Sequence, residues 1–177
     1  MEETLKYVKT REVKSPCRAH GTDAGIDFFV PTSLTQDDMA QKYEVVNSYP
    51  TVEVGEDGFI KKWILLPGES ILIPSGIKVK VPDGYMLQFH NKSGVASKRH
   101  LLVGANTVDI GYEGECHINL HNVGDEEQAI NAGDKIVQGI IIPVNFAMPE
   151  EVDNESILFK DSTSERKENG FGSTGNS

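Results

Sequence analysis

Short apolar runs separated by proline and glycine constrain this chain more than any other feature of its sequence. Between residues 65 and 89, β-prone stretches alternate with turn sequences at 66–69, 74–76 and 82–84. The region lacks the period of a long helix, and short strands at this spacing are typical of sandwiches and barrels. The pattern predicts an all-β fold, a single-domain antiparallel jelly roll or sandwich.

Two later runs extend the same pattern. Residues 128–130 and 136–144 are β-prone and flank a polar turn at 131–134. The second run is almost entirely apolar, so we expect burial on both faces, either at the centre of a sandwich or between subunits. Near the start of the chain, Asp27 stands where a glycine-containing loop enters an apolar run, either as a turn residue or as a carboxylate that faces a site.

Composition narrows the class of protein. The chain has 177 residues, of which 38% are hydrophobic and 25% charged, enough for one domain with a sizeable core. It has no apolar run long enough to span a membrane and no apolar N-terminal stretch, so we expect a cytoplasmic protein without membrane contact. The net charge of −10 argues against nonspecific nucleic-acid binding. Cys17 and Cys116 are too far apart to indicate a zinc site or a disulfide framework.

Residues 32–62 differ from the sequence that follows them. Thr35 is a candidate helix cap with acids in the next turn, which predicts a helix that continues to Val46. Residues 51–54 and 59–64 flank the turn sequence at 55–58, which indicates a hairpin. We interpret 32–62 as an inserted arm within a β domain of residues 1–163.

A first candidate site lies in residues 104–122, which we interpret as a β-hairpin with Asp109 at its bend. Gly111 and Gly114 bracket Tyr112, so the chain must turn tightly there. A carboxylate and an aromatic ring on a supported turn suit a small-molecule site, because the carboxylate can orient a water molecule. Taken alone, these residues are more often explained by ordinary turn chemistry.

A second candidate site follows the run at 85–89. Lys92, Ser93 and the Gly94 amide offer a phosphate one cation, one short donor and a close backbone approach. A solvated basic turn is the alternative. Residues 164–177 have the composition of a flexible glycine-rich tail, yet their backbone N–H groups and hydroxyls could wrap an anion.

Five stretches of the sequence, taken in order, resemble the five motifs of the homotrimeric dUTPases. Each is weak alone, but their order along the chain makes the resemblance specific. It covers residues 4–31 and 65–175. The stretches are Ala24–Asp27, Lys92–Ala96, Gly104–Gly114 with Asp109 and Tyr112, Gly133–Gln138, and Arg166 with Gly170–Gly175.

The resemblance implies a jelly-roll homotrimer with shared active sites. Such enzymes hydrolyse dUTP to dUMP and pyrophosphate with Mg²⁺, which keeps uracil out of DNA and supplies dUMP for dTMP synthesis. By this resemblance, Asp109 orients the water that attacks the α-phosphorus. Tyr112 packs against the deoxyribose and excludes UTP, and Asp27 lies near the metal, through water.

The remaining substrate contacts are also implied by the resemblance. The tail is expected to close over the nucleotide, with Phe171 stacking on uracil and the residues around it gripping the γ-phosphate. Uracil is read by the backbone of Gly104, Ala105, Asn106, Thr107 and Val108. The phosphates are held by Lys92, Ser93, Gly94 and Gln138, and the tail contributes Arg166, Phe171, Gly172, Ser173 and Thr174.

The sequence departs from the family pattern in two places. Lys92 stands where most members have arginine, which replaces a bidentate fork by a point charge. The arm at 32–62 lengthens the usual link between the first two motifs, either as a surface extension or as a docking surface for another protein. A nucleotide-gated interaction protein is therefore one alternative. A dCTP deaminase is a weaker one, because Asn119 occupies the position of its catalytic glutamate.

Overall fold

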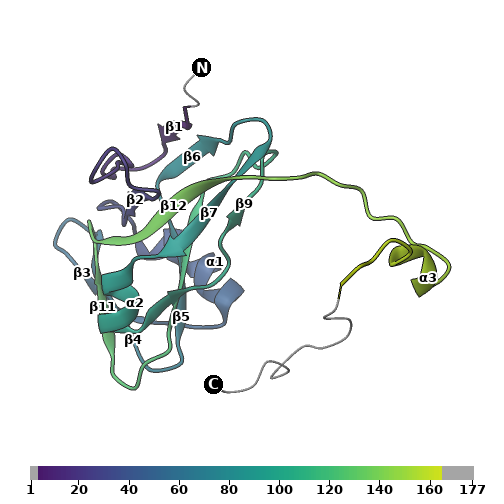
Figure 1. The fold of residues 1–177 in the computed structure, drawn as a ribbon. Coiled ribbons are helices and arrows are strands. Elements are labelled where there is room, and N and C mark those ends of the chain that lie inside the picture. Colours follow the sequence, from purple (N-terminus) through teal and green to yellow (C-terminus); the bar gives the residue numbers. More distant parts are fainter. Residues whose placement is uncertain (1–3, 165–177) are drawn as a thin grey trace. The chain divides into compact units, whose positions relative to one another are not determined.

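The computed structural model describes residues 4–164, and strands predominate in this part of the chain (Figure 1). The chain divides into two compact units, Met1–Asn145 and Phe146–Ser177. The first unit contains the strands β1 to β12, and the described part of the second contains the short helix α3 (Glu155–Leu158). Within residues 4–164, no helix is both long enough and apolar enough to cross a membrane.

All strand pairings in the first unit are antiparallel, as predicted. Two sheets consist, in hydrogen-bonded order, of β1 (Lys6–Lys9) and β6 (Ile77–Lys80), and of β5 (Ser70–Pro74), β10 (His117–Asn122) and β8 (Leu101–Val103). The other two consist of β11 (Gln128–Asn131), β4 (Ile60–Leu65) and β3 (Thr51–Val54), and of β2 (Ile26–Phe29), β12 (Lys135–Pro143), β7 (Tyr85–Asn91) and β9 (Thr107–Val108).

The predicted turns form where glycine permits a left-handed backbone. Gly76, between β5 and β6, has a φ of 72°, and Gly84, before β7, has a φ of 86°. At Gly76 a Cβ atom would also lie only 2.9 Å from Cγ1 of Val13. Both positions therefore favour the one residue that adopts this conformation without steric cost.

The core lies between the sheets and is filled by their inward-facing side chains. Phe28 of β2 and Phe89 of β7 meet edge to face, with ring centroids 4.9 Å apart. Aromatic pairs prefer this geometry because the positive ring edge faces the negative π-face. Side chains from all four sheets complete the core, among them Trp63, Ile71, Ile73, Val79, Leu87, Ile118, Leu120, Ile130 and Val137.

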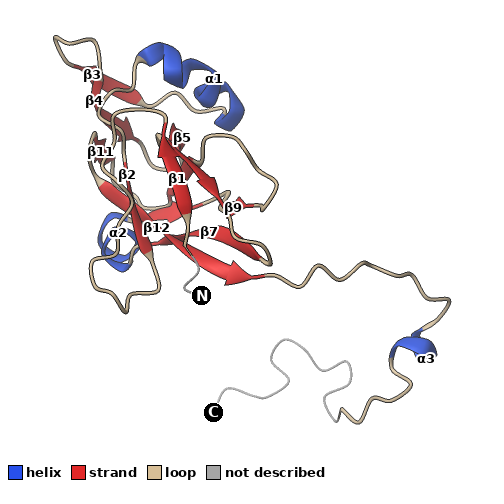
Figure 2. Cartoon of the chain, turned by 90° about the horizontal axis from the view of Figure 1, so that it is seen from above, coloured by secondary structure: helices blue, strands red, loops and turns tan. Residues whose placement is uncertain are grey.

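The arm at 32–62 folds as predicted but is not a surface appendage. Helix α1 (Gln36–Val46) begins at Thr35, whose side chain and that of Asp38 form a capping box. Strands β3 and β4 form the predicted hairpin, and β4 also pairs with β11. Helix α1 packs against β5 (Figure 2), and Leu34, Met39 and Ile60 are fully buried.

The structure corrects the expected hairpin at 104–122. The turn forms, with Tyr112 N–H donating to Asp109 O at 3.0 Å. However, β9 pairs with β7, whereas β10 pairs with β5 and β8, so the strands on either side of the turn belong to different sheets. Local turn residues predicted the bend, but tertiary partners decide which strands pair.

The predicted burial of the apolar run at 136–144 holds for only part of β12. Ile136 and Val137 are buried, whereas Ile140, Ile141 and Ile142 are half-buried in the single chain. The strand lies between β2 and β7 and is paired along both edges. Burial of the second half of the run between subunits stays a prediction.

Because the arm contributes to the core, truncating its buried side chain should destabilise the whole unit. Met39→Ala is expected to lower the free energy of unfolding by roughly 2–5 kcal/mol, since it leaves a cavity. Val45→Ala on the same helix is the control, because Val45 is 68% exposed and its truncation should change stability by less than about 0.5 kcal/mol. If urea denaturation showed equally small effects of Met39→Ala and Val45→Ala on the free energy of unfolding, the arm would not be part of the common core.

Candidate functional site

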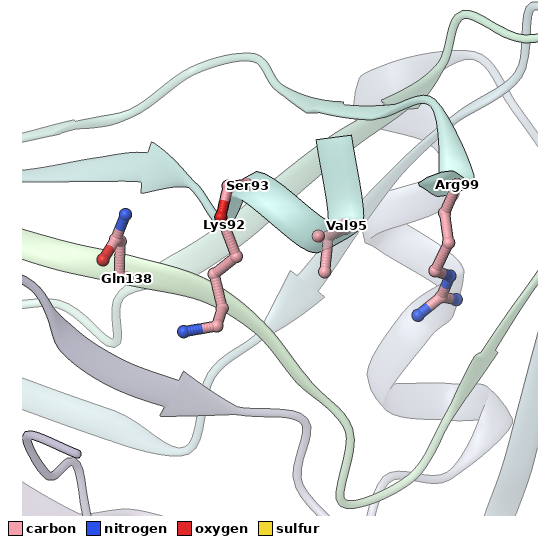
Figure 3. A pocket seen from close by; sticks show the side chains of 6 residues that line it. Lys92, Ser93, Val95, Arg99 and Gln138 are labelled. Carbon is pink, nitrogen blue, oxygen red and sulfur yellow. The ribbon is translucent and has the colours of Figure 1, made fainter. Parts of the chain in front are cut away.

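A pocket of about 320 Å³ opens where β7 ends and helix α2 (Ser93–Arg99) begins (Figure 3). Lys92 is the N-cap residue of α2, and because its ammonium group can only donate, it does not cap the helix N–H groups but contacts Asp27 instead. Strand β12 brings Gln138 beside β7. We call this pocket the basic pocket, and its lining residues are Lys92, Ser93, Gly94, Val95, Arg99 and Gln138.

Asp27 is the buried centre of an ion-pair cluster beside the basic pocket. Its Oδ1 accepts a hydrogen bond from Lys92 Nζ, and its Oδ2 lies 3.0 Å from Lys135 Nζ. Burial alone would raise the pKa of Asp27, but the hydrogen bonds and charges of the two lysines lower that pKa overall. Asp27 is therefore ionised at neutral pH and is not merely a turn residue.

Gln138 reaches the basic pocket because Gly25 makes room for it. A Cβ atom at Gly25 would lie 2.9 Å from the Gln138 Cβ atom and closer still to its amide. The Gln138 Nε2 group donates to the Asn91 carbonyl at 2.9 Å, which sets the side-chain direction. The sequence Ala-Gly-Ile-Asp thus supplies both a gap for Gln138 and a carboxylate for Lys92.

Arg99 lines the basic pocket. In a chain of net charge −10, the basic cluster of Lys92, Lys98 and Arg99 indicates local capture of an anion, although no role at the substrate was predicted for Arg99 itself. Its guanidinium donates to the Ala129 carbonyl and lies 3.6 Å from Asp134 Oδ2. These partners hold Arg99 at the wall of the pocket. The neighbouring Lys98 is exposed and does not line it. The basic run at 98–99 was the only sequence signal, and it did not distinguish the two residues.

A second pocket, of about 180 Å³, lies at the turn that joins β9 to β10. We call it the turn pocket. It combines the predicted acid, the predicted aromatic ring and the predicted backbone segment with residues from β5, β7 and the start of β10. Its lining residues are Leu72, Phe89, Ala105, Asn106, Thr107, Val108, Asp109, Tyr112, Cys116 and His117.

Asn119 supports the wall of the turn pocket and was missed as a site residue. Its buried side chain accepts a hydrogen bond from Ala105 N–H at 2.8 Å and donates to Ile71 O at 3.0 Å. Gly104 N–H donates to Asn119 O at 3.0 Å, and Gly104 itself does not line the pocket. The amide of Asn119 therefore holds the backbone, and no carboxylate for deamination stands there.

Tyr112 is held at the rim of the turn pocket by its own turn. The side chain is 43% exposed, and its hydroxyl donates to the Glu115 carbonyl at 2.9 Å. A Cβ atom at Gly114 would come within 2.9 Å of the ring carbon Cε2. Glycine at position 114 is thus what allows the ring to lie against the turn.

The predicted site residues fall into two groups. Lys92, Ser93, Gly94 and Gln138 meet at the basic pocket, whereas the segment 105–109 and Tyr112 meet at the turn pocket. The two pockets share no lining residue. The predicted tail contacts lie outside the described residues, namely Arg166, Phe171, Gly172, Ser173 and Thr174.

The described residues do not build a metal cage by themselves. Between residues 4 and 164, no group of three or more His, Cys, Asp or Glu side chains could hold a metal ion. Both oxygens of Asp27 already face lysine ammonium groups. The two lysines therefore leave no unpaired oxygen for direct coordination, and Asp27 would hold a metal ion only through water.

Comparison with known proteins defines the class of this protein. Residues 59–175 match the family model of the dUTPases, so the chain belongs to the dUTPase family, as its motifs predicted. The deoxyuridine 5′-triphosphate nucleotidohydrolase of Chlamydia felis is 37% identical over 113 residues, which are 63% of this chain and 75% of that protein. The enzyme of the same name from Caulobacter vibrioides is 39% identical over 114 residues, 63% of this chain and 70% of the relative.

Solved structures give the same classification for the fold. The dUTPase of Staphylococcus bacteriophage 80alpha with dUpNHpp has a TM-score of 0.71 and 26% identity, over 99% of this chain and all of that one. A mutant dUTPase of phage phi11 of S. aureus, described with a structural Mg(II) ion, has a TM-score of 0.63 and 24% identity, over 87% of this chain and 99% of that chain. The antiparallel fold is therefore dUTPase-like.

The Asp27 cluster predicts a specific dependence of stability on pH. Because the folded-state pKa of Asp27 lies below its unfolded value, the ionised carboxylate stabilises the fold above about pH 4. This contribution is lost as the pH falls through the folded-state pKa. Asp27→Asn should therefore be less stable than wild type at pH 7, and the difference in unfolding free energy should shrink in acid.

Urea denaturation at a series of pH values measures this difference. The matched control is Asp125→Asn, because Asp125 is an exposed acid in a turn. Its effect on stability should be small throughout the series. A destabilisation by Asp27→Asn that does not vary with pH would contradict the role assigned to the carboxylate charge.

Proposed function

We propose that this chain hydrolyses dUTP to dUMP and pyrophosphate. The observation that carries the proposal is the meeting of Asp109, Tyr112 and the 105–108 backbone at one pocket in a chain of the dUTPase family. A carboxylate beside a pyrimidine-sized pocket can orient an attacking water molecule. The reaction would remove a precursor of uracil in DNA and supply dUMP.

The turn pocket is the proposed site for uracil and deoxyribose. The backbone of residues 105–108 offers N–H and C=O groups, which can distinguish uracil from cytosine by their hydrogen-bonding edges. Asp109 follows β9 directly, and its carboxylate would orient the water that attacks the α-phosphorus. Tyr112 would pack against the sugar where a 2′-hydroxyl would otherwise sit.

The basic pocket is the proposed site for phosphate groups. Lys92, Ser93, Gly94 and Gln138 offer one cation and several neutral donors around a space of about 320 Å³. Because Lys92 is paired with Asp27 in the free protein, an incoming phosphate would share or take over this ammonium group. Lys135 remains as the partner of Asp27, so the buried carboxylate would stay compensated.

We propose Mg²⁺ as the cofactor. When bound, it offsets the negative charge of the triphosphate and draws the phosphate oxygens together. Asp27 is paired with Lys92 at the basic pocket, and it would contact the ion only through water. The lysines and backbone amides of this chain would supply the rest of the electrostatic stabilisation.

A homotrimer with shared active sites is part of the proposal. The uracil and phosphate pockets share no lining residue, which favours a site completed by other copies of the chain. Half-buried Ile140, Ile141 and Ile142 provide apolar surface for such contacts. The tail residues Arg166 and Phe171 to Thr174 would close over the nucleotide and exclude water.

A second candidate function is a nucleotide-gated interaction with a protein partner through the arm. One observation favours it: Val45, Tyr49 and Val54 are large apolar side chains of the arm that are exposed. Exposed apolar side chains provide surface for a protein contact. Single exposed apolar side chains are also common on soluble proteins, so their exposure alone does not identify a partner. The arm would act in addition to hydrolysis.

Pyrophosphate release from purified protein with Mg²⁺ tests the proposed function. We expect rapid turnover of dUTP and little turnover of dCTP, dTTP or UTP, because the turn pocket is expected to read both base and sugar. Tight dUTP binding without pyrophosphate release would contradict hydrolysis and would favour the interaction function. Comparable turnover of all four nucleotides would contradict the assignment of the turn pocket.

Asp109→Asn separates catalysis from binding. We expect hydrolysis to be abolished while dUTP affinity stays within about an order of magnitude, because the carboxylate stabilises the transition state more than the bound substrate. The control is Asp83→Asn, which changes an exposed acid in another turn and should leave turnover unchanged. Substantial turnover by Asp109→Asn would refute the catalytic role.

A further inference from the structure

Arg11 joins two acids that are far apart in the sequence. Its Nη1 atom lies 2.7 Å from Asp38 Oδ1, and its Nε atom lies 2.9 Å from Glu115 Oε1. The three side chains are only 24%, 26% and 15% exposed, so water screens these contacts less than it screens surface pairs. The guanidinium fork suits this arrangement, because it donates in two directions at once.

One end of this link is the first turn of helix α1. Asp38 uses its other oxygen, Oδ2, to accept hydrogen bonds from the backbone N–H and the hydroxyl of Thr35. Burial alone would raise the pKa of Asp38, but the contacts with Thr35 and Arg11 lower that pKa overall. Asp38 is therefore a charged residue that ties Arg11 to the arm.

The other end is the turn that carries Tyr112. Glu115 Oε1 also accepts a hydrogen bond from Gly76 N–H at 2.6 Å, so this side chain is held from two sides. The carbonyl of the same residue accepts the Tyr112 hydroxyl at 2.9 Å. Helix α1 is thus linked to the aromatic ring through Arg11 and Glu115, which binds Arg11 with its side chain and the Tyr112 hydroxyl with its backbone carbonyl.

Helix α1 also influences the turn pocket through charge. His117 lines the pocket two residues after Glu115. Burial lowers the pKa of His117, and the positive charge of Lys42 on helix α1 lowers it further.

We propose that Arg11 is a positioning residue that couples the arm to sugar selection at Tyr112. This inference rests on the proposed function, in which the Tyr112 ring excludes a 2′-hydroxyl. Without Arg11, the Glu115 side chain would keep only its bond from Gly76. The peptide that carries the Glu115 carbonyl would still be held by Cys116 N–H, which donates to Ile77 O at 2.8 Å, but the side chain of the same residue would anchor it less firmly. The ring would then reject ribose less strictly.

The test compares kcat/KM for dUTP and UTP in wild type and Arg11→Ala. We expect the dUTP to UTP ratio of kcat/KM to fall roughly tenfold. A change of this size corresponds to the loss of one or two charged hydrogen bonds that help to position the Tyr112 ring. Lys62→Ala is the matched control. It removes an ion pair of similar length within the arm, 2.7 Å from Glu53, that does not reach the turn.

A pair of variants at the start of helix α1 separates coupling from helix stability. Asp38→Asn and Thr35→Ala both weaken the capping box, but only Asp38 contacts Arg11. Asp38→Asn should lower the dUTP to UTP ratio, whereas Thr35→Ala should lower the melting temperature without changing this ratio. Equal ratios in the two variants would contradict a path through Arg11.

Double substitution tests whether the effect passes through the ring. If Arg11 acts by way of Tyr112, combining Arg11→Ala with Tyr112→Phe should lower the ratio no further than the larger single effect. Additive losses would overturn the inference. If Arg11→Ala does not fold, Arg11→Lys is measured instead, because one ammonium group cannot reproduce both contacts of the fork.

The outcomes separate this inference from the proposed function. A wild-type protein that does not hydrolyse dUTP would refute the proposed function. A wild-type protein that hydrolyses dUTP selectively, combined with an Arg11→Ala variant whose ratio is unchanged, would refute only the coupling. An equal loss of activity toward both nucleotides would likewise refute it, since such a loss marks a purely structural role.

Discussion

The register of strand β12 is the constraint on which the basic pocket depends. Pairing with β2 places Gln138 opposite Asp27, and pairing with β7 places it opposite His90. A slip of one residue would turn Gln138 to the other face of the sheet. Gly139 protects this register, because a side chain there would meet Phe28 and Leu87. The pocket is thus a product of strand pairing as much as of its lining residues.

The turn pocket depends on a crossing between sheets. Strand β9 lies at the edge of one sheet, whereas β10 lies in the middle of another, between β5 and β8. The intervening segment must bridge the two, and Asp109 stands where it leaves the first sheet. The Asn119 side chain accepts a hydrogen bond from the backbone of Ala105, just before β9, and donates one to Ile71 of β5. The backbone that carries Asp109 is therefore held by both sheets, which restricts its position more than an isolated hairpin would.

Local signals in the sequence predicted much of this structure. The Thr35 cap, the 51–64 hairpin and the turns at Gly76 and Gly84 each depend on neighbouring residues, and all of them form. Motif resemblance grouped Asp109 with Tyr112 correctly. Neither the partners of β9 and β10 nor the contact between Arg11 and Glu115 could be predicted, since 104 residues separate the latter pair. Such contacts depend on tertiary packing, which local patterns do not encode.

The burial of the arm also limits how the length of this chain can vary during evolution. Leu34, Met39 and Ile60 are part of the common core, so losing the whole arm would uncover apolar side chains of the β domain. The tip between β3 and β4 differs: Glu56, Asp57 and Gly58 are exposed, and a Cβ atom at Gly58 would meet nothing within 4 Å. Insertions and deletions should therefore accumulate at this tip, while the helix and strands behind it keep their length.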